Sequence, residues 1–393
     1  MTYQKPKSHV GRYMFLLISI IFLVASGVFF WPIIASKYGL EFTKKSNEVE
    51  MATQSSKKNE QRLLKATYKD LPYATVNTFQ GERELKMNIF KPLKDTGEIT
   101  PVLIYIHGGN WQTGDYNNGY RDPSLKEGES LNINVTDGSQ NKTFKGLSKI
   151  IDRGVTFVTV DYRLVDEAIF PAQIHDVKSA VRFLRANSEK FGIDPNKIAV
   201  AGEDAGAQLA LLLGMTGGVP DYEGDIGGNT EYSSNVLAVV DFQGPTDILN
   251  LGIDGNSRYI SRKEAAEKHD GPNAPEAKLL GFNKPEEGIS VLRGLKSKKK
   301  TKDPAYEKVK LAEMASPLYQ VKSSNAPILI IHGVKNTTIP IRQSLKLTDS
   351  LLRYGVENIY ISNSEGEYGY PGDYSIDMAQ EWIYNKLVNG KER

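Results

Sequence analysis

The chain has 393 residues, and its 49 Lys and Arg residues against 47 Asp and Glu residues leave a formal net charge of only +2. This length suits one large domain with accessory segments, and the balanced charge gives no reason to expect nucleic acid as a partner. Because the chain has no cysteine, a disulfide framework, a catalytic thiol and a thiolate metal site are excluded. No metal and no cofactor is expected.

The N-terminal part contains a charge-free apolar segment at residues 13–36, which is long enough to span a bilayer. Three basic residues precede it, so the positive-inside rule predicts a cytoplasmic tail at residues 1–12 and a large domain outside the membrane. The apolar run continues past the small residues 25–27, which favours an uncleaved signal anchor over a removed signal peptide. We therefore expect a single-pass cell-membrane protein of a Gram-positive-type bacterium, with its large domain extracytoplasmic.

The segment after the apolar run, residues 37–70, is polar and has no apolar periodicity. This composition is typical of a stalk between a membrane and a folded domain. The domain is predicted at residues 71–393. It opens with two probable strands, at residues 74–79 and 84–90.

Two further strands follow, each with a distinctive sequence at its end. The apolar strand at residues 102–106 runs into H-G-G-N-W at residues 107–111, and the strand at residues 155–160 runs into D-Y-R-L at residues 161–164. The sequence F-P-A-Q-I-H-D-V at residues 170–177 then opens a helix.

Residues 202–206 read G-E-D-A-G, between a short buried strand at residues 197–201 and an Ala- and Leu-rich helix at residues 204–214. This is the pattern of a nucleophile elbow, a strained strand-to-helix turn whose glycines allow close backbone approach and whose central residue projects above the sheet. A serine is expected at the tip of such an elbow. Asp204 stands there instead.

The C-terminal part supplies the remaining predicted elements. An irregular stretch at about residues 245–315 takes the position of a lid. A core strand at residues 328–331 leads into H-G-V-K-N-T-T-I-P-I-R-Q-S at residues 332–344. The last strand, at residues 358–361, is followed by a loop at residues 364–370.

These sequences resemble, in the same order, the H-G-G-x-W, D-Y-R-L, F-P-A-Q-I-x-D-V, G-E-S-A-G and H-G-x-x-D-x-x-V-P-x-x-Q-S motifs of a known family. The family is the carboxylesterase and lipase-like branch of the α/β-hydrolase fold, which includes hormone-sensitive-lipase and feruloyl-esterase-like proteins. The resemblance covers the chain from about residue 71 to the C-terminus. It implies a mostly parallel central sheet flanked by helices, with a lid at about residues 245–315, and ester hydrolysis as the activity of the family.

The same resemblance places all three catalytic positions on substituted residues. Asp204 takes the position of the nucleophilic serine, Asn336 that of the acid, and Tyr368 that of the histidine. The histidine count agrees, because none of the five histidines lies beyond residue 332. Serine attacks an ester only when an imidazole, held by a carboxylate, takes its proton. Tyr368 is a poor base at neutral pH, and Asn336 carries no negative charge.

The oxyanion loop, in contrast, is expected to be intact. The backbone N–H groups of Gly108, Gly109 and Ala205 are predicted to converge near the elbow, at a helix N-terminus that favours negative charge. A carboxylate at residue 204 would lie at or beside that anion site. We therefore interpret Asp204 as an internal plug rather than an attacking group.

Three functions follow from these residues. The leading hypothesis is a pseudoenzyme that binds a small molecule, an envelope polymer or a protein partner through the old pocket and lid. The first alternative is an active carboxylic-ester hydrolase that uses Asp204; haloalkane dehalogenases and epoxide hydrolases do use an elbow aspartate, but they keep the histidine. The second alternative is a structural or assembly factor of the cell envelope, whose working surface is the stalk and the basic lid and whose pocket is vestigial.

A lysine-rich run at residues 293–302 lies within the predicted lid. One interpretation is a patch for anionic envelope polymer or lipid headgroups, and the other is an ordinary solvated loop. The sequence leaves both open.

Overall fold

The computed structural model describes residues 64–92, 97–117, 142–255, 257–282, 284 and 287–390. These residues belong to one compact unit, Leu64–Arg393. The predicted cytoplasmic tail, the membrane anchor at residues 13–36 and most of the stalk lie outside them. Among the described helices, none is both long and apolar enough to cross a membrane.

An eight-stranded sheet forms the centre of the domain, with the strand order β1-β2-β4-β3-β5-β6-β7-β8. The two β1–β2 and β2–β4 pairings are antiparallel, and all the others are parallel. The strands are β1 (Tyr68–Thr78), β2 (Gly81–Phe90), β3 (Thr100–Ile106), β4 (Thr156–Val160), β5 (Ile193–Glu203), β6 (Val239–Phe242), β7 (Ile328–Gly333) and β8 (Asn358–Asn363). This is the mostly parallel sheet that the sequence predicts.

The first strand begins earlier than predicted. Tyr68 pairs with Ile89 across the β1–β2 ladder, so the last residues assigned to the stalk already belong to the sheet. The start of β1 is hard to recognise in the sequence because β1 is an edge strand and its first residues are exposed or only partly buried. Such residues need not be apolar.

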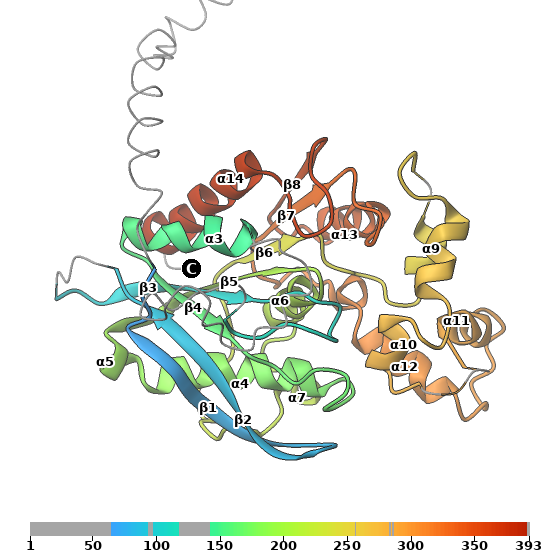
Figure 1. The fold of residues 1–393 in the computed structure, drawn as a ribbon, viewed down its shortest axis with the longest axis horizontal. Helices are drawn as coiled ribbons and strands as arrows, with labels where there is room; N and C mark the ends of the chain where they lie inside the picture. The colour runs from blue at the N-terminus through green and yellow to red at the C-terminus, as the bar shows by residue number, and fades with distance from the viewer. Residues whose placement is uncertain are drawn as a thin grey trace, which may run out of the picture. The chain divides into compact units, whose positions relative to one another are not determined.

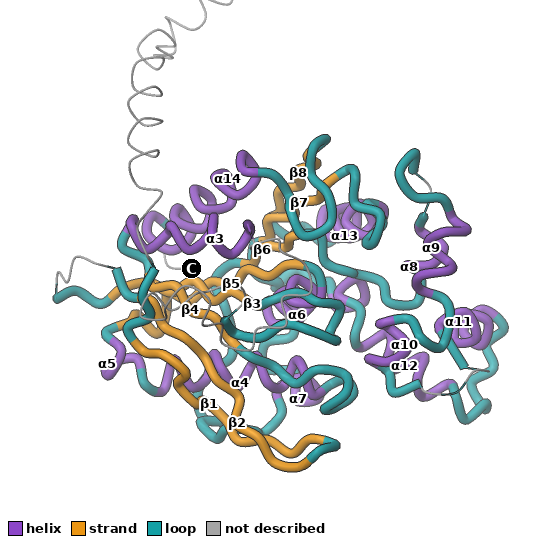
Figure 2. The backbone as a smooth tube through the Cα atoms, in the orientation of Figure 1, coloured by secondary structure: helices purple, strands orange, loops and turns teal. Residues whose placement is uncertain are grey.

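Helices cover both faces of the sheet (Figures 1 and 2). Along β3, Val102, Ile104 and Ile106 pack into one apolar cluster and the alternate residues Leu103 and Tyr105 into another. This alternation is the period of two that a strand imposes on its side chains. The first cluster is covered by α4 (Ala172–Ala186), α6 (Ala205–Met215) and α13 (Arg342–Arg353), and the second by α3 (Lys142–Ser148) and α14 (Asp373–Tyr384).

The segment between β6 and β7 is helical, whereas the sequence predicts an irregular stretch there. It contains α8 (Leu251–Asp254), α9 (Arg262–His269), α10 (Pro275–Leu279), α11 (Ile289–Ser297) and α12 (Tyr306–Met314). Four of these helices, α9 to α12, gather at one end of the Leu64–Arg393 domain, on the right in Figure 1. Two short helices elsewhere are α5 (Ser188–Phe191) and α7 (Pro220–Glu223), and single turns are Lys149–Arg153, Pro317–Gln320 and Asn385–Asn389.

The parallel strands bring the predicted site loops to one edge of the sheet. The loops after β3, β5, β6, β7 and β8 all leave from the carboxyl ends of neighbouring parallel strands. In open α/β sheets, ligands bind at this edge. The site can therefore be built from these five loops.

Candidate active site

Asp204 occupies the tip of a strained turn between β5 and α6. Its backbone has φ of 50° and ψ of −120°, a conformation that residues with a side chain rarely adopt. The flanking glycines are required by close approach: a Cβ on Gly202 would lie 2.2 Å from the Gly206 carbonyl oxygen, and one on Gly206 would lie 2.2 Å from that of Ile106. The geometry is that of a nucleophile elbow with a carboxylate at its tip.

One oxygen of the Asp204 carboxylate accepts three hydrogen bonds. Its Oδ2 lies 3.0 Å from the backbone nitrogen of Gly109, 2.7 Å from that of Asn110 and 2.8 Å from the hydroxyl of Tyr368. The Ala205 N–H, the third predicted donor, is not among these hydrogen bonds but lowers the pKa of the carboxyl group. Donors of this kind, aimed at one point beside an elbow, form the oxyanion hole of acyl-transfer enzymes. Here the protein's own carboxylate occupies that point.

Gly108 is predicted as an oxyanion-hole donor, and its N–H is not among the hydrogen bonds that the Asp204 carboxylate accepts. A Cβ on Gly108 would lie 3.0 Å from the carbonyl oxygen of Glu203 and 3.1 Å from the Cβ of Asp204. Its role is therefore to let the loop approach the elbow, and the donating pair lies one residue further along, at Gly109 and Asn110.

Asn110 completes the ring of contacts around Asp204. Its side-chain amide donates to the Tyr368 hydroxyl at 3.0 Å, while its backbone N–H donates to Asp204. The next residue, Trp111, anchors the loop by donating its indole N–H to Gln208 of α6 at 3.2 Å. Sequence reasoning missed Asn110, although its position directly after the two glycines was a usable signal.

Burial raises the pKa of Asp204 above its usual value and outweighs the hydrogen bonds from Asn110, Tyr368 and Gly109 and the effect of the Ala205 N–H, which lower it. Burial also raises the pKa of Tyr368 far above its ordinary value, and the nearby charge of Asp204 raises it further. Tyr368 therefore remains a phenol that donates to Asp204. It has no capacity to act as a base for a nucleophile or a water molecule.

Asn336 is not among the hydrogen-bond partners of the Asp204 carboxylate and is held by its own loop. Its Oδ1 accepts from the backbone nitrogens of Thr338 and Ile339, both at 2.8 Å, and its amide donates to Oε1 of Gln243 at 2.8 Å. Gln243 in turn donates to the carbonyl oxygen of Glu367 at 2.9 Å. Asn336 thus reaches the Tyr368 loop through Gln243, a residue that sequence reasoning missed.

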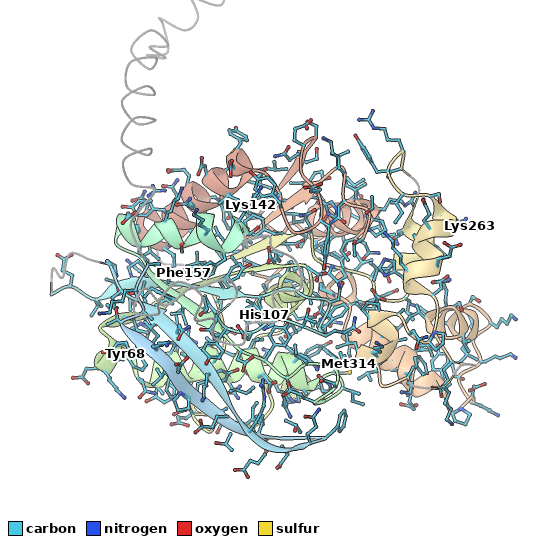
Figure 3. All side chains as sticks on the ribbon, in the orientation of Figure 1. Tyr68, His107, Lys142, Phe157, Lys263 and Met314 are labelled. Carbon is cyan, nitrogen blue, oxygen red and sulfur yellow. The ribbon has the colours of Figure 1, made fainter. Side chains whose placement is uncertain are left out.

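The two most deeply buried histidines near the strand ends are structural. Burial lowers the pKa of both His107 and His332 to about 4. His107, labelled near the middle of Figure 3, stacks on Tyr162 with ring centroids 4.3 Å apart. His332 donates to the Ile339 carbonyl oxygen at 3.0 Å and faces the Ser344 hydroxyl at 2.8 Å. Neither histidine is bonded to Asp204.

The chemistry available to this arrangement is limited. Among the described residues, Asp204 has no imidazole as a hydrogen-bond partner, and no group of three or more His, Asp or Glu side chains is placed to hold a metal ion. The described contacts of Asp204 therefore contain no proton relay. The backbone N–H groups that could bind an anion, those of Gly109 and Asn110, already donate to Asp204.

Comparison with known proteins identifies the family. The BD-FAE family profile matches residues 87–351, well over half of the chain. This chain belongs to the BD-FAE family. It is thus an α/β-hydrolase of the carboxylesterase and lipase-like group, as the sequence motifs predict.

Two of the related proteins in the same comparisons are esterases of Mycobacterium tuberculosis. The chain is 26% identical to esterase LipC of Mycobacterium tuberculosis over 251 residues, which are 64% of this chain and 48% of LipC. It is 24% identical to esterase LipQ of the same organism over 76% of this chain and 56% of LipQ. The chain thus spans about half the length of these curated relatives.

Solved structures share the fold of this BD-FAE protein. A truncated carbohydrate esterase from gut microbiota superposes with a TM-score of 0.59 and 23% identity, covering 82% of this chain and 100% of the esterase. Butyrate-bound esterase 2 of Thermogutta terrifontis superposes with a TM-score of 0.52 and 19% identity, covering 78% and 91%. At these identities the likeness establishes the architecture.

Proposed function

We propose that this BD-FAE protein is a catalytically degenerate member of its family that binds a ligand or partner rather than hydrolysing esters. The observation that carries the proposal is the Asp204 carboxylate, whose Oδ2 accepts from Gly109, Asn110 and Tyr368. An oxyanion would need those same donors. Substrate activation is therefore blocked by contacts within the protein, in addition to the loss of serine, acid and histidine.

The ligand chemistry follows from the other oxygen of the same carboxyl group. Oδ1 of Asp204 is buried and has no hydrogen-bond partner within the described part of the chain. A buried acceptor without a partner favours a ligand that brings a hydrogen-bond donor. Asn110 and Tyr368 remain partly exposed beside it. The proposed ligand therefore carries a hydroxyl or ammonium group, and an anionic group is disfavoured.

A hydrolysis assay on the purified full-length protein tests the loss of catalysis. We expect no turnover of p-nitrophenyl acetate or butyrate beyond the background without protein, because loss of triad members commonly reduces the rate by several powers of ten. The matched control is Asp204→Ala. Robust turnover that disappears in this variant would overturn the proposal and establish an aspartate-dependent ester hydrolase.

The protein is also proposed to be anchored in the cell membrane by residues 13–36, with the domain outside the cytoplasm. Support comes from the sequence: the segment is free of charge, and basic residues precede it. Protease added to intact cells or spheroplasts is expected to digest the domain while a membrane-bound N-terminal fragment survives. Full-length protein in the soluble cytoplasmic fraction, protected until lysis, would contradict the anchor.

A further inference from the structure

The α9–α10 segment contains a buried acid–base pair that the active-site argument does not use. His269 is the last residue of α9, and Glu276 lies in α10. The two residues are only 2% and 1% exposed. Histidine and glutamate are seldom buried to this extent unless they are paired. A change in the protonation of this buried pair is therefore expected to affect how the two helices pack.

Both ring nitrogens of His269 face an oxygen. Nε2 lies 2.7 Å from the carbonyl oxygen of Thr338, and Nδ1 lies 2.9 Å from Oε1 of Glu276. A carbonyl oxygen only accepts, so Nε2 carries a hydrogen. The contact between Nδ1 and Oε1 then needs one more proton, placed either on the ring or on the carboxyl group. The arrangement therefore holds one proton more than a neutral histidine beside an ionised glutamate.

The surrounding charges favour this extra proton. Burial, the largest single effect, lowers the pKa of His269, but the charge and hydrogen bond of Glu276 and the Thr338 carbonyl together raise it above its usual value. Lys268 lowers the pKa of His269, and its ammonium group donates to the Thr337 carbonyl. On α8, which packs against α9, Asp254 is already engaged by Lys346 at 2.7 Å.

The pair connects two parts of the site region. Thr338 belongs to the loop after β7, and its backbone N–H is one of the two that donate to Asn336. On the other side, His269 and Glu276 lie in the helices that gather at one end of the domain (Figure 1). We propose that His269 and Glu276 form a proton-dependent latch that holds α9 and α10 together where His269 contacts the 336–339 loop. The latch is closed while the pair holds its extra proton and weakens when that proton is lost.

The direction of the pH dependence follows from linkage. The folded-state pKa of His269 is raised, so its contribution to stability is complete below the unfolded pKa of about 6.5 and is lost as the pH rises through the folded value. The protection of the α9–α10 amides from hydrogen exchange is therefore expected to fall as the pH rises. The fall is up to about tenfold for each pH unit by which the folded-state pKa of His269 exceeds its unfolded-state pKa.

Hydrogen exchange of the full-length protein at pH 6 and pH 9, corrected for the intrinsic exchange rate, tests the latch. We expect the amides of α9 and α10 to lose protection at pH 9 relative to those of α4, the internal reference. In Glu276→Gln, the amide can donate to a neutral Nδ1, and its oxygen can take the place of Oε2, which has no hydrogen-bond partner among the described residues. The pH response of α9 and α10 is therefore expected to disappear in this variant.

His175→Gln is the matched control, because the His175 ring contacts the carbonyl oxygen of Asp221 and is not part of the pair. This variant is expected to keep the wild-type pH response. The latch is overturned if wild-type α9 and α10 show the same protection relative to α4 at both pH values. It is equally overturned if Glu276→Gln responds to pH as the wild type does. Should that variant fail to fold, the wild-type comparison alone decides.

Discussion

Changing Asp204→Ser, Asn336→Asp and Tyr368→His together is expected to produce ester hydrolysis where the unaltered chain has none. The elbow, the loop donors Gly109 and Asn110, and the helix behind them are already in place. Serine at position 204 removes the carboxylate from the donors, and the other two changes supply the base and its orienting acid. We expect an increase of about 100-fold or more over the unaltered protein in turnover of short acyl esters, since triad members act as a unit.

The single variants are the controls for this restoration. Asp204→Ser alone is expected to gain little, because a serine without an imidazole remains a weak nucleophile. The side chain of Gln243 is the main structural obstacle to the triple variant, since it stands between Asn336 and the backbone of Glu367. A triple variant that folds but stays inactive, both with Gln243 and with Gln243→Gly, would show that these three positions do not form the old triad.

The fold could be predicted because the apolar strands and the order of the motifs along the chain are both visible in the sequence. The alternation of Val102, Leu103 and Ile104 between two apolar clusters is visible in the sequence as an apolar run. The meeting of Asp204 with Tyr368, 164 positions apart, could be expected because loops at the carboxyl ends of parallel strands converge. Topology explains why Asp204 and Tyr368 meet, but their assignment as site residues depends on the resemblance to the family motifs.

Other features of the site depend on contacts that no local pattern reports. The position of Asn336 is fixed by its own loop and by Gln243, 93 positions away, and the side chain of Asn110 reaches Tyr368 across 258 positions. The helices between β6 and β7 were missed because several of them are short, between four and nine residues. Their stability comes from tertiary packing rather than from propensity.

A buried ion pair joins two of the family sequences, D-Y-R-L at residues 161–164 and F-P-A-Q-I-H-D-V at residues 170–177. Arg163 of the first donates through Nε and Nη2 to the carboxylate of Asp176 in the second, at distances from 2.7 to 3.1 Å. The backbone nitrogen of Arg163 donates to the same carboxylate at 2.8 Å. Asp176 is fully buried, so this fork-shaped ion pair ties the loop after β4 to helix α4.

Replacing Arg163 by methionine is expected to destabilise the domain by about 3–5 kcal/mol, the usual effect of leaving one buried charge without its partner. Burial raises the pKa of Asp176, and the hydrogen bonds and charge of Arg163 are the main influences that lower it. Without the guanidinium, the folded-state pKa of Asp176 rises further. With a raised folded-state pKa, the Asp176 carboxyl favours the folded state only while it is protonated. The loss of stability in Arg163→Met is therefore expected to be larger at pH 8 than at pH 5. Urea unfolding at both pH values measures it.

The double variant Arg163→Met with Asp176→Asn separates the lost ion pair from lost packing. Because a neutral amide needs no counter-charge, this variant is expected to recover part of the stability at pH 8 and to lose the added pH dependence. If the single and double variants are equally unstable at pH 8, the methionine at 163 acts through packing alone. The two family sequences would then be coupled by shape, and the assignment of their role to the buried charge pair would be wrong.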